Sequence, residues 1–135
     1  MAFRALPKPA KLAVEAKMRT KDELGLSGEQ LAADYLEDRG IRVIDSNWRC
    51  SSGEIDIVAL DGQDLVIVEV KTRRSRRYGD PLEAITKAKL LRLRTLAVLW
   101  ARDHNRVVGA VRIDAVGIIM GGTQVPSIDH IKGVA

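Results

Sequence analysis

Three charged side chains on two neighbouring segments have the types and spacing that phosphoryl chemistry requires. Asp56 lies in an alternating segment, residues 54–60, while Glu69 and Lys71 lie two residues apart in a second one, residues 65–71. Carboxylate oxygens and water are the ligands that Mg²⁺ and Mn²⁺ prefer, and an ammonium group can neutralise a phosphate oxygen as negative charge develops on it. Asp56 and Glu69 are therefore candidate ligands of Mg²⁺ or Mn²⁺, with Lys71 as a candidate catalytic group.

The turn between these segments determines which acids face each other. Residues 61–64 read Asp-Gly-Gln-Asp, and Asp-Gly is a strong signal for a β-hairpin. A two-residue turn places Glu69 opposite Glu54, and a four-residue turn places it opposite Asp56. Both put three carboxylates and one ammonium on one face, where facing like charges cost about 1 kcal/mol in water and about 4 kcal/mol near a protein surface. A divalent cation would relieve this repulsion; the alternative is a solvated polar face on which Lys71 bridges two acids.

The opposite face of the predicted hairpin is wholly apolar and should be buried against a helix. Its side chains are Ile55, Ile57, Ala59, Val66, Val68 and Val70. The preceding helix is predicted to begin at an N-cap at Ser27, with Gln30 completing a capping box, and to end at Gly40 after about twelve residues. Residues 41–47 alternate enough to form a first strand.

A second helix and further β structure follow the hairpin. Asp80 is a predicted N-cap, with Pro81 at the first helical position, and apolar residues at helical spacing extend this helix to about Asp103. Residues 107–120 are a final β segment, either two strands or one long bent strand. The order α-β-β-β-α-β predicts an α/β sandwich with a central mixed sheet flanked by helices, as a single domain over residues 23–135. Residues 1–22 are interpreted as a flexible basic tail.

Composition narrows the class of protein. The chain has 135 residues, 46% of them hydrophobic and 30% charged, which excludes a disordered or fibrous protein. One cysteine excludes an internal disulfide framework, and with only two histidines it excludes a tetrahedral zinc site built from Cys and His. No apolar run reaches the roughly 20 residues of a membrane span, and the N-terminus lacks the apolar core of a signal peptide. We therefore expect a cytoplasmic protein without a membrane partner.

Charge is distributed in blocks along the sequence. Residues 22–70 carry twelve acidic and three basic side chains, and residues 71–106 carry three acidic and eleven basic ones. Four arginines follow Lys71 closely: Arg73, Arg74, Arg76 and Arg77. We expect them to bind a phosphate backbone, with Tyr78 stacking on a base and Lys87 extending the positively charged surface. Aromatic residues are only 4% of the chain, which favours recognition of backbone and shape over base sequence. The alternatives are a solvated arginine loop and oppositely charged blocks that pair with each other.

Several motifs resemble a known nuclease superfamily. Gly53-Glu54-Ile55-Asp56-Ile57-Val58 followed by Val68-Glu69-Val70-Lys71 is similar to the PD-(D/E)XK motif, with Ile55 in the place of the proline. Four further segments resemble motif positions of one family within this superfamily: Gly28-Glu29-Gln30, Asn47-Trp48-Arg49, Gly79-Asp80-Pro81 and Arg112-Ile113-Asp114. Residues 24–120 thereby resemble the YraN family, whose members are similar to Holliday-junction resolvases.

The resemblance implies a restriction-endonuclease-like fold and a metal-dependent nuclease that acts on structured nucleic acid, with branched DNA as the expected partner. A homodimer would suit paired cuts in a symmetric junction. Asp56 and Glu69 would bind Mg²⁺ or Mn²⁺, with the Val70 carbonyl as a third ligand and Lys71 as the catalytic lysine. Glu29 resembles the first-helix acid of related resolvases, although an acid near a helix N-terminus is also favoured for its charge alone. A nucleic-acid-binding module that keeps the fold without cleaving and a protein-interaction module are the alternatives.

Overall fold

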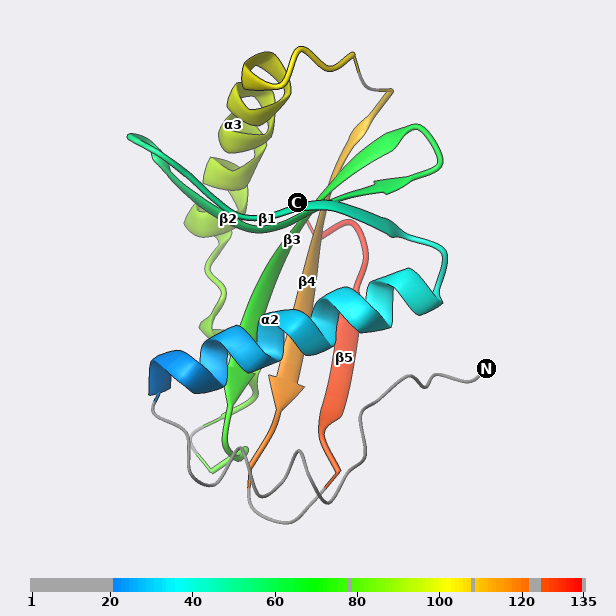
Figure 1. Ribbon diagram of the computed structural model, residues 1–135. Coiled ribbons are helices and arrows are strands. Elements are labelled where there is room, and N and C mark those ends of the chain that lie inside the picture. The colour runs from blue at the N-terminus through cyan, green and yellow to red at the C-terminus, as the bar shows by residue number, and fades with distance from the viewer. Residues whose placement is uncertain (1–20, 78, 108, 122–124, 135) are drawn as a thin grey trace.

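The computed structural model describes residues 21–77, 79–107, 109–121 and 125–134, so most of the predicted tail and Tyr78 lie outside the described residues. Figure 1 shows how the described elements are arranged. In chain order they are α2 (Lys21–Asp38), β1 (Arg42–Cys50), β2 (Gly53–Asp61), β3 (Asp64–Arg73), the 3₁₀ turn η1 (Pro81–Ala84), α3 (Lys87–Asp103), β4 (Val111–Ile119) and β5 (Ser127–Ile131).

The five strands form one mixed sheet between two helices (Figure 1). The strand order equals the chain order, and β3 and β4 run parallel while the other neighbouring pairs are antiparallel. Because parallel neighbours need a crossover connection, η1 and α3 lie between β3 and β4 in the chain. α2 packs on one face and α3 on the other, which confirms the predicted α/β sandwich of restriction-endonuclease-like type. Of the helices in the described ranges, none is long and apolar enough to cross a membrane.

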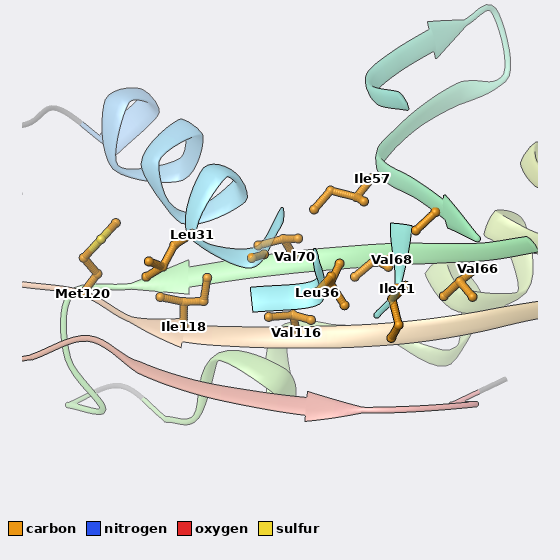
Figure 2. Packing of buried hydrophobic residues seen from close by; sticks show 12 residues of the cluster. Leu31, Leu36, Ile41, Ile57, Val66, Val68, Val70, Val116, Ile118 and Met120 are labelled. Carbon is orange, nitrogen blue, oxygen red and sulfur yellow. The ribbon is translucent and has the colours of Figure 1, made fainter. Parts of the chain in front are cut away.

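The face of the sheet beneath α2 is packed with aliphatic side chains (Figure 2). Leu31 and Leu36 of α2 join side chains from β2, β3 and β4, and Met120 just after β4, in one buried cluster: Ile57, Ala59, Val66, Val68, Val70, Val116, Ile118 and Met120. Burying one such side chain fully stabilises the fold by about 1.5–3 kcal/mol, so this layer fixes α2 on the sheet. Gly28 allows the close approach, because a Cβ there would overlap Thr72 Oγ1 of β3.

The two ends of α2 differ in how well the sequence predicts them. Gly40 has a φ of 81°, and the N–H groups of Gly40 and Ile41 donate to the carbonyls of Glu37 and Leu36, so the predicted glycine C-cap is confirmed. The helix begins at Lys21, however, so the prediction of an N-cap at Ser27 is wrong. Extending an existing helix adds one hydrogen bond per residue without a new nucleation cost, so a potential capping residue does not by itself start a helix.

The predicted second helix is divided in two. Asp80 caps η1, as predicted, with Glu83 as its capping-box partner, but Ile85 then adopts an extended conformation with φ −92° and ψ 113°. A new helix, α3, begins behind Thr86, whose side chain accepts a hydrogen bond from Lys89 N–H at 3.1 Å. The turn η1 is anchored separately, because a Cβ at Gly117 of β4 would lie only 2.8 Å from Leu82 Cγ.

The sheet also contains a strand that the sequence analysis missed. The final β segment is one strand, β4, and the chain continues into β5 at the edge of the sheet. β5 has five residues and reads Ser-Ile-Asp-His-Ile, which is too short and too polar for a clear two-residue period. Its pairing with β4 and the burial of the His130 side chain, which is 4% exposed, hold it in the sheet.

Candidate metal and nucleic-acid site

The hairpin register places Asp56 across from Glu69. β2 and β3 pair from Asp61 with Asp64 to Ile57 with Val68, which is the second of the two predicted registers. The ladder ends there, and the Asp56 carboxylate accepts a hydrogen bond from Val70 N–H at 2.9 Å. β2 continues only as the partner of β1 and bends toward α3 (Figure 1). The candidate site therefore lies at the point where β2 separates from β3.

The separation of the strands changes which side chains share a face. Ile57 packs beneath α2, whereas Ile55 packs with Val58 beneath α3, so the prediction that Ile55 and Ile57 share one face is wrong. In β1, Ser46 pairs with Ile57 and Trp48 pairs with Ile55, so Asn47 lies across from Asp56. Asn47 has a φ of 51°. A left-handed residue interrupts the regular alternation of a strand. The bend thus directs the first residues of β2 toward α3 and leaves Asp56 beside β3.

Burial shifts the two facing acids toward their protonated forms. Glu69 is 6% exposed, and burial together with the charge of Asp56 raises its pKa to about 7. The pKa of Asp56 is also raised, mainly by burial, although the hydrogen bond from Val70 opposes the change. The two carboxyls thus form a desolvated pair that would gain from a nearby positive charge.

Two lysines supply part of that charge. Lys89 Nζ lies 3.6 Å from Glu69 Oε2, and its charge lowers the pKa of both Glu69 and Asp56. Lys71 also lowers the pKa of Glu69. Sequence reasoning missed Lys89 because it assigned one continuous helix from Asp80. A signal was present: α3 has no acid in its first turn and begins with Lys87 and Lys89, whereas a helix N-terminus ordinarily favours acids.

Glu29 brings a third carboxyl toward the pair from α2. Burial and the charge of Asp56 raise its pKa to about 7, while interactions with Asn47 and Arg49 lower it in part. Its Oε1 atom is buried without a hydrogen-bond partner among the described residues. Such an atom is costly unless something supplies a donor or a cation. Glu29 therefore lies close enough to Asp56 to act with it.

The predicted phosphate-binding residues extend from the same end of β3. Arg73 is its last residue and is half-buried, and the arginines that follow are exposed: Arg74, Arg76 and Arg77. Arg76 lies 3.5 Å from Asp129 of β5 in a solvent-exposed pair, which contributes little to stability. Lys87 is exposed at the start of α3. The basic side chains are thus placed directly beyond Lys71 and Glu69.

The donor set fits a hard divalent cation that keeps several waters. Within the described ranges, no group of three or more Asp, Glu, His and Cys side chains encloses a metal position. Mg²⁺ is typically held by one or two carboxylates, with water or phosphate oxygens completing its shell. Asp56 and Glu69 supply two desolvated carboxyls. The unpartnered Oε1 of Glu29 adds an acceptor that could hold a metal-bound water.

In metal-free buffer, the free energy of unfolding should fall by about 1–3 kcal/mol as the pH rises from 5 to 7. Glu29 and Glu69 have pKa values of about 7 in the fold, against 4.5 ordinarily, so over this range the folded chain holds protons that the unfolded chain has lost. Urea unfolding at several pH values measures the slope. Glu69→Gln should flatten it, whereas Glu37→Gln at an exposed position of α2 should not. Parallel profiles for wild type and Glu69→Gln would contradict the raised pKa.

Comparison with known proteins identifies the family. The model of the uncharacterised protein family UPF0102 matches residues 28–118. A UPF0102 protein of Renibacterium salmoninarum is 62% identical over 117 residues, covering 87% of this chain and 99% of the relative. UPF0102 proteins of Arthrobacter sp. strain FB24 and Beutenbergia cavernae are 56% and 46% identical, each over 87% of this chain and 99% of the relative. The chain therefore belongs to the UPF0102 family, which is the YraN family that its motifs resemble.

Proposed function

We propose that this protein is a divalent-metal-dependent nuclease that hydrolyses phosphodiester bonds in structured nucleic acid, with branched DNA as the expected substrate. The observation that carries the proposal is the buried acid pair, Asp56 and Glu69, at the point where β2 leaves β3. Lys71 and Lys89 lie close enough to change the pKa of Glu69. Desolvated acids beside lysines at a strand end are an arrangement suited to binding a metal and a phosphate together.

Each residue of the site would have a separate role. Asp56 and Glu69, with the Val70 carbonyl, would hold Mg²⁺ or Mn²⁺, which when bound supplies a Lewis acid and lowers the pKa of water. Val70 N–H orients the Asp56 carboxylate at 2.9 Å. Lys71 would stabilise negative charge on the phosphate during the reaction. Glu29, with its pKa of about 7, would accept or release a proton at neutral pH.

Nucleic-acid affinity should depend on the exposed arginines and fall steeply with salt. The arginine cluster consists of Arg73, Arg74, Arg76 and Arg77. Replacing all four by serine removes up to four phosphate contacts, so the slope of log affinity against log salt should shrink in magnitude by about 0.9 per contact on duplex DNA. Fluorescence anisotropy at several salt concentrations measures this slope. Arg106→Ser, exposed beyond the end of α3, is a matched control for one lost charge.

The basic residues before α2 need their own control. A chain that starts at Lys21, the first residue of α2, separates their contribution from that of the arginine cluster. If that chain loses binding while the arginine variant keeps it, the phosphate track lies outside residues 73–77. A slope change close to four contacts would place all four arginines on phosphates.

One observation favours a second function, a nucleic-acid-binding module that does not cleave. Lys89 Nζ already lies 3.6 Å from Glu69 and lowers the pKa of that acid. An ammonium in this position makes the folded protein less dependent on a cation. In this alternative the acid pair would be a structural feature of the fold and the arginines would carry the function.

A cleavage panel distinguishes the two functions. Linear, flap and four-way substrates are incubated with Mg²⁺ or Mn²⁺ and wild-type protein, Asp56→Asn or Asp34→Asn. Asp34 is a suitable control because it lies on α2 and accepts a hydrogen bond from Gln30 at 3.1 Å. We expect cleavage by wild type and Asp34→Asn but not by Asp56→Asn. Binding without cleavage on every substrate would establish the binding module instead.

A further inference from the structure

A pocket separate from the acid pair lies between the turn that joins β1 to β2 and the C-terminal half of α3. Its volume is about 610 Å³, and its walls include Trp48 and Arg49 of β1 together with Leu99 and Arg102 of α3. Pockets of this size accept small organic groups, and an aromatic wall with a few polar side chains is typical of their lining. None of these four residues belongs to the acid pair or to the arginine cluster.

Trp48, the aromatic wall of the pocket, contacts His104, which in turn stacks on Trp100. Trp48 is half-buried, and its ring lies 6.4 Å from that of His104 at an angle of 64°. His104 stacks on Trp100 at 4.2 Å, and Trp100 Nε1 donates a hydrogen bond to Asp45 at 2.8 Å. Trp100 itself is 2% exposed. The contact with His104 restricts the Trp48 ring, which lowers the entropy cost of stacking a ligand on it.

Positive charge flanks this wall. The Arg49 side chain is 77% exposed and lies 3.3 Å from Glu54 in an ion pair on the surface that is easily exchanged. Arg102 is exposed on α3 at the rim of the same pocket. Asp103 also lines the rim and lies 3.8 Å from His104 Nδ1. An apolar aromatic surface in a pocket whose lining includes exposed arginines is suited to a nucleobase and its phosphates.

The pocket is close to the candidate metal site along two elements. Lys89, at the acid pair, and Leu99, in the pocket, are ten residues apart on α3, which is about 15 Å of helix. On the other side, Ser52 lines the pocket in the turn before β2 and lies four residues from Asp56, about 13 Å of extended chain. These lengths correspond to about four nucleotides of a stacked strand at 3.4 Å each.

We propose that this pocket binds one unpaired base of the nucleic acid, stacked on Trp48 with its phosphates on Arg49 and Arg102. This inference rests on the proposed function and narrows its substrate to nucleic acid with unpaired nucleotides near the scissile bond, as in flaps and open junctions. A base inside a continuous duplex has to be extruded first, which costs free energy, so such a pocket discriminates against duplex without reading sequence.

Tryptophan fluorescence tests the pocket directly. Trp48 and Trp100 are the two tryptophans of the chain, and because Trp100 is buried, quenching by a bound base reports on Trp48. Full-length protein is titrated with a short oligothymidylate and, separately, with a blunt duplex, both in EDTA. We expect quenching by the oligothymidylate, with Trp48→Leu weakening its binding by about 5- to 100-fold and Trp48→Phe by much less. Affinity for the duplex should be unchanged in both variants.

Charge variants keep the test valid if Trp48→Leu fails to fold. Arg102→Ser should weaken binding of the oligothymidylate more than Arg106→Ser, which removes the same charge outside the pocket. Equal losses for the two arginines, equal losses on single strand and duplex, or an absence of quenching would each overturn the pocket. The fluorescence titration is done in EDTA and therefore does not depend on cleavage. If the fluorescence is quenched but the separate assay with Mg²⁺ or Mn²⁺ shows no cleavage, the base pocket is supported and the proposed nuclease activity fails.

Discussion

Lys71→Ala should abolish detectable cleavage, a loss of roughly 1,000-fold, and leave nucleic-acid affinity almost unchanged. Lys71 lies two residues beyond Glu69 on β3, and its charge lowers the pKa of that acid. A charge aimed at the reacting phosphate contributes mainly to the transition state, whereas ground-state binding is shared among many cations. Single-turnover cleavage of the best substrate in the panel, with affinity measured separately, gives both quantities.

Two further variants show whether a loss of activity is specific to Lys71. Lys132→Ala removes the same charge at an exposed position near the C-terminus and should cleave like wild type. Lys89→Ala removes the ion pair with Glu69 and should show whether this lysine positions the acid or only neutralises it. Activity of Lys71→Ala close to wild type would reject the catalytic role of Lys71. An equal fall in affinity and rate would make it a binding residue instead.

Asp114→Ala should destabilise the fold by about 3–5 kcal/mol, because it leaves buried cationic and polar partners without their acceptor. Asp114 is fully buried in β4 and binds Arg112 at 2.9 and 3.1 Å, His130 at 2.8 Å and Gly133 N–H at 3.0 Å. Arg112 in turn lies 2.9 Å from Asp61 at the end of β2. This network connects β5 to the hairpin, and urea unfolding measures its contribution.

The network also predicts acid sensitivity. Burial alone would raise the pKa of Asp114, but hydrogen bonds from His130, Arg112 and Gly133 together lower it below 3.8. Its contribution to stability is therefore present above pH 4 and lost as the pH falls through the lowered pKa. Asp129→Ala on the neighbouring strand is the control, since Asp129 is 52% exposed in its pair with Arg76 and should cost under about 0.5 kcal/mol. Similar losses for the two variants would contradict a buried network.

Local sequence signals predicted the elements that carry the site. The alternation of residues 54–60 and 65–71 reflects the two faces of a sheet covered by helices, and the structure forms both strands there. The Asp-Gly turn and the glycine at residue 40 act through backbone conformation, with φ values of 64° at Gly62 and 81° at Gly40. Such signals depend on a few adjacent residues, which is why they can be read without the rest of the fold.

Features set by packing between distant segments were not predictable in the same way. Two registers of the hairpin satisfied the pattern equally, and the structure has the one that pairs Asp61 with Asp64 and so places Glu69 opposite Asp56. The bend at Asp56 moves Ile55 to the α3 side, which no period of two residues can show. Lys89 reaches Glu69 only because the chain stops being helical at Ile85. These contacts depend on how β2, α3 and β4 pack together, and the roles assigned to the acids remain predictions.

Calorimetric titration of Mn²⁺ into metal-free protein measures whether Asp56 and Glu69 bind a divalent cation. A cation that binds only the folded site should also raise the thermal stability of wild type, since ligands of the native state stabilise it by mass action. Wild type and Glu37→Gln should bind one class of Mn²⁺ site with the same heat, and Asp56→Asn and Glu69→Gln, verified as folded, should lose it. Equal Mn²⁺ binding by wild type and both site variants would contradict a metal site at Asp56 and Glu69 and place the metal away from this hairpin.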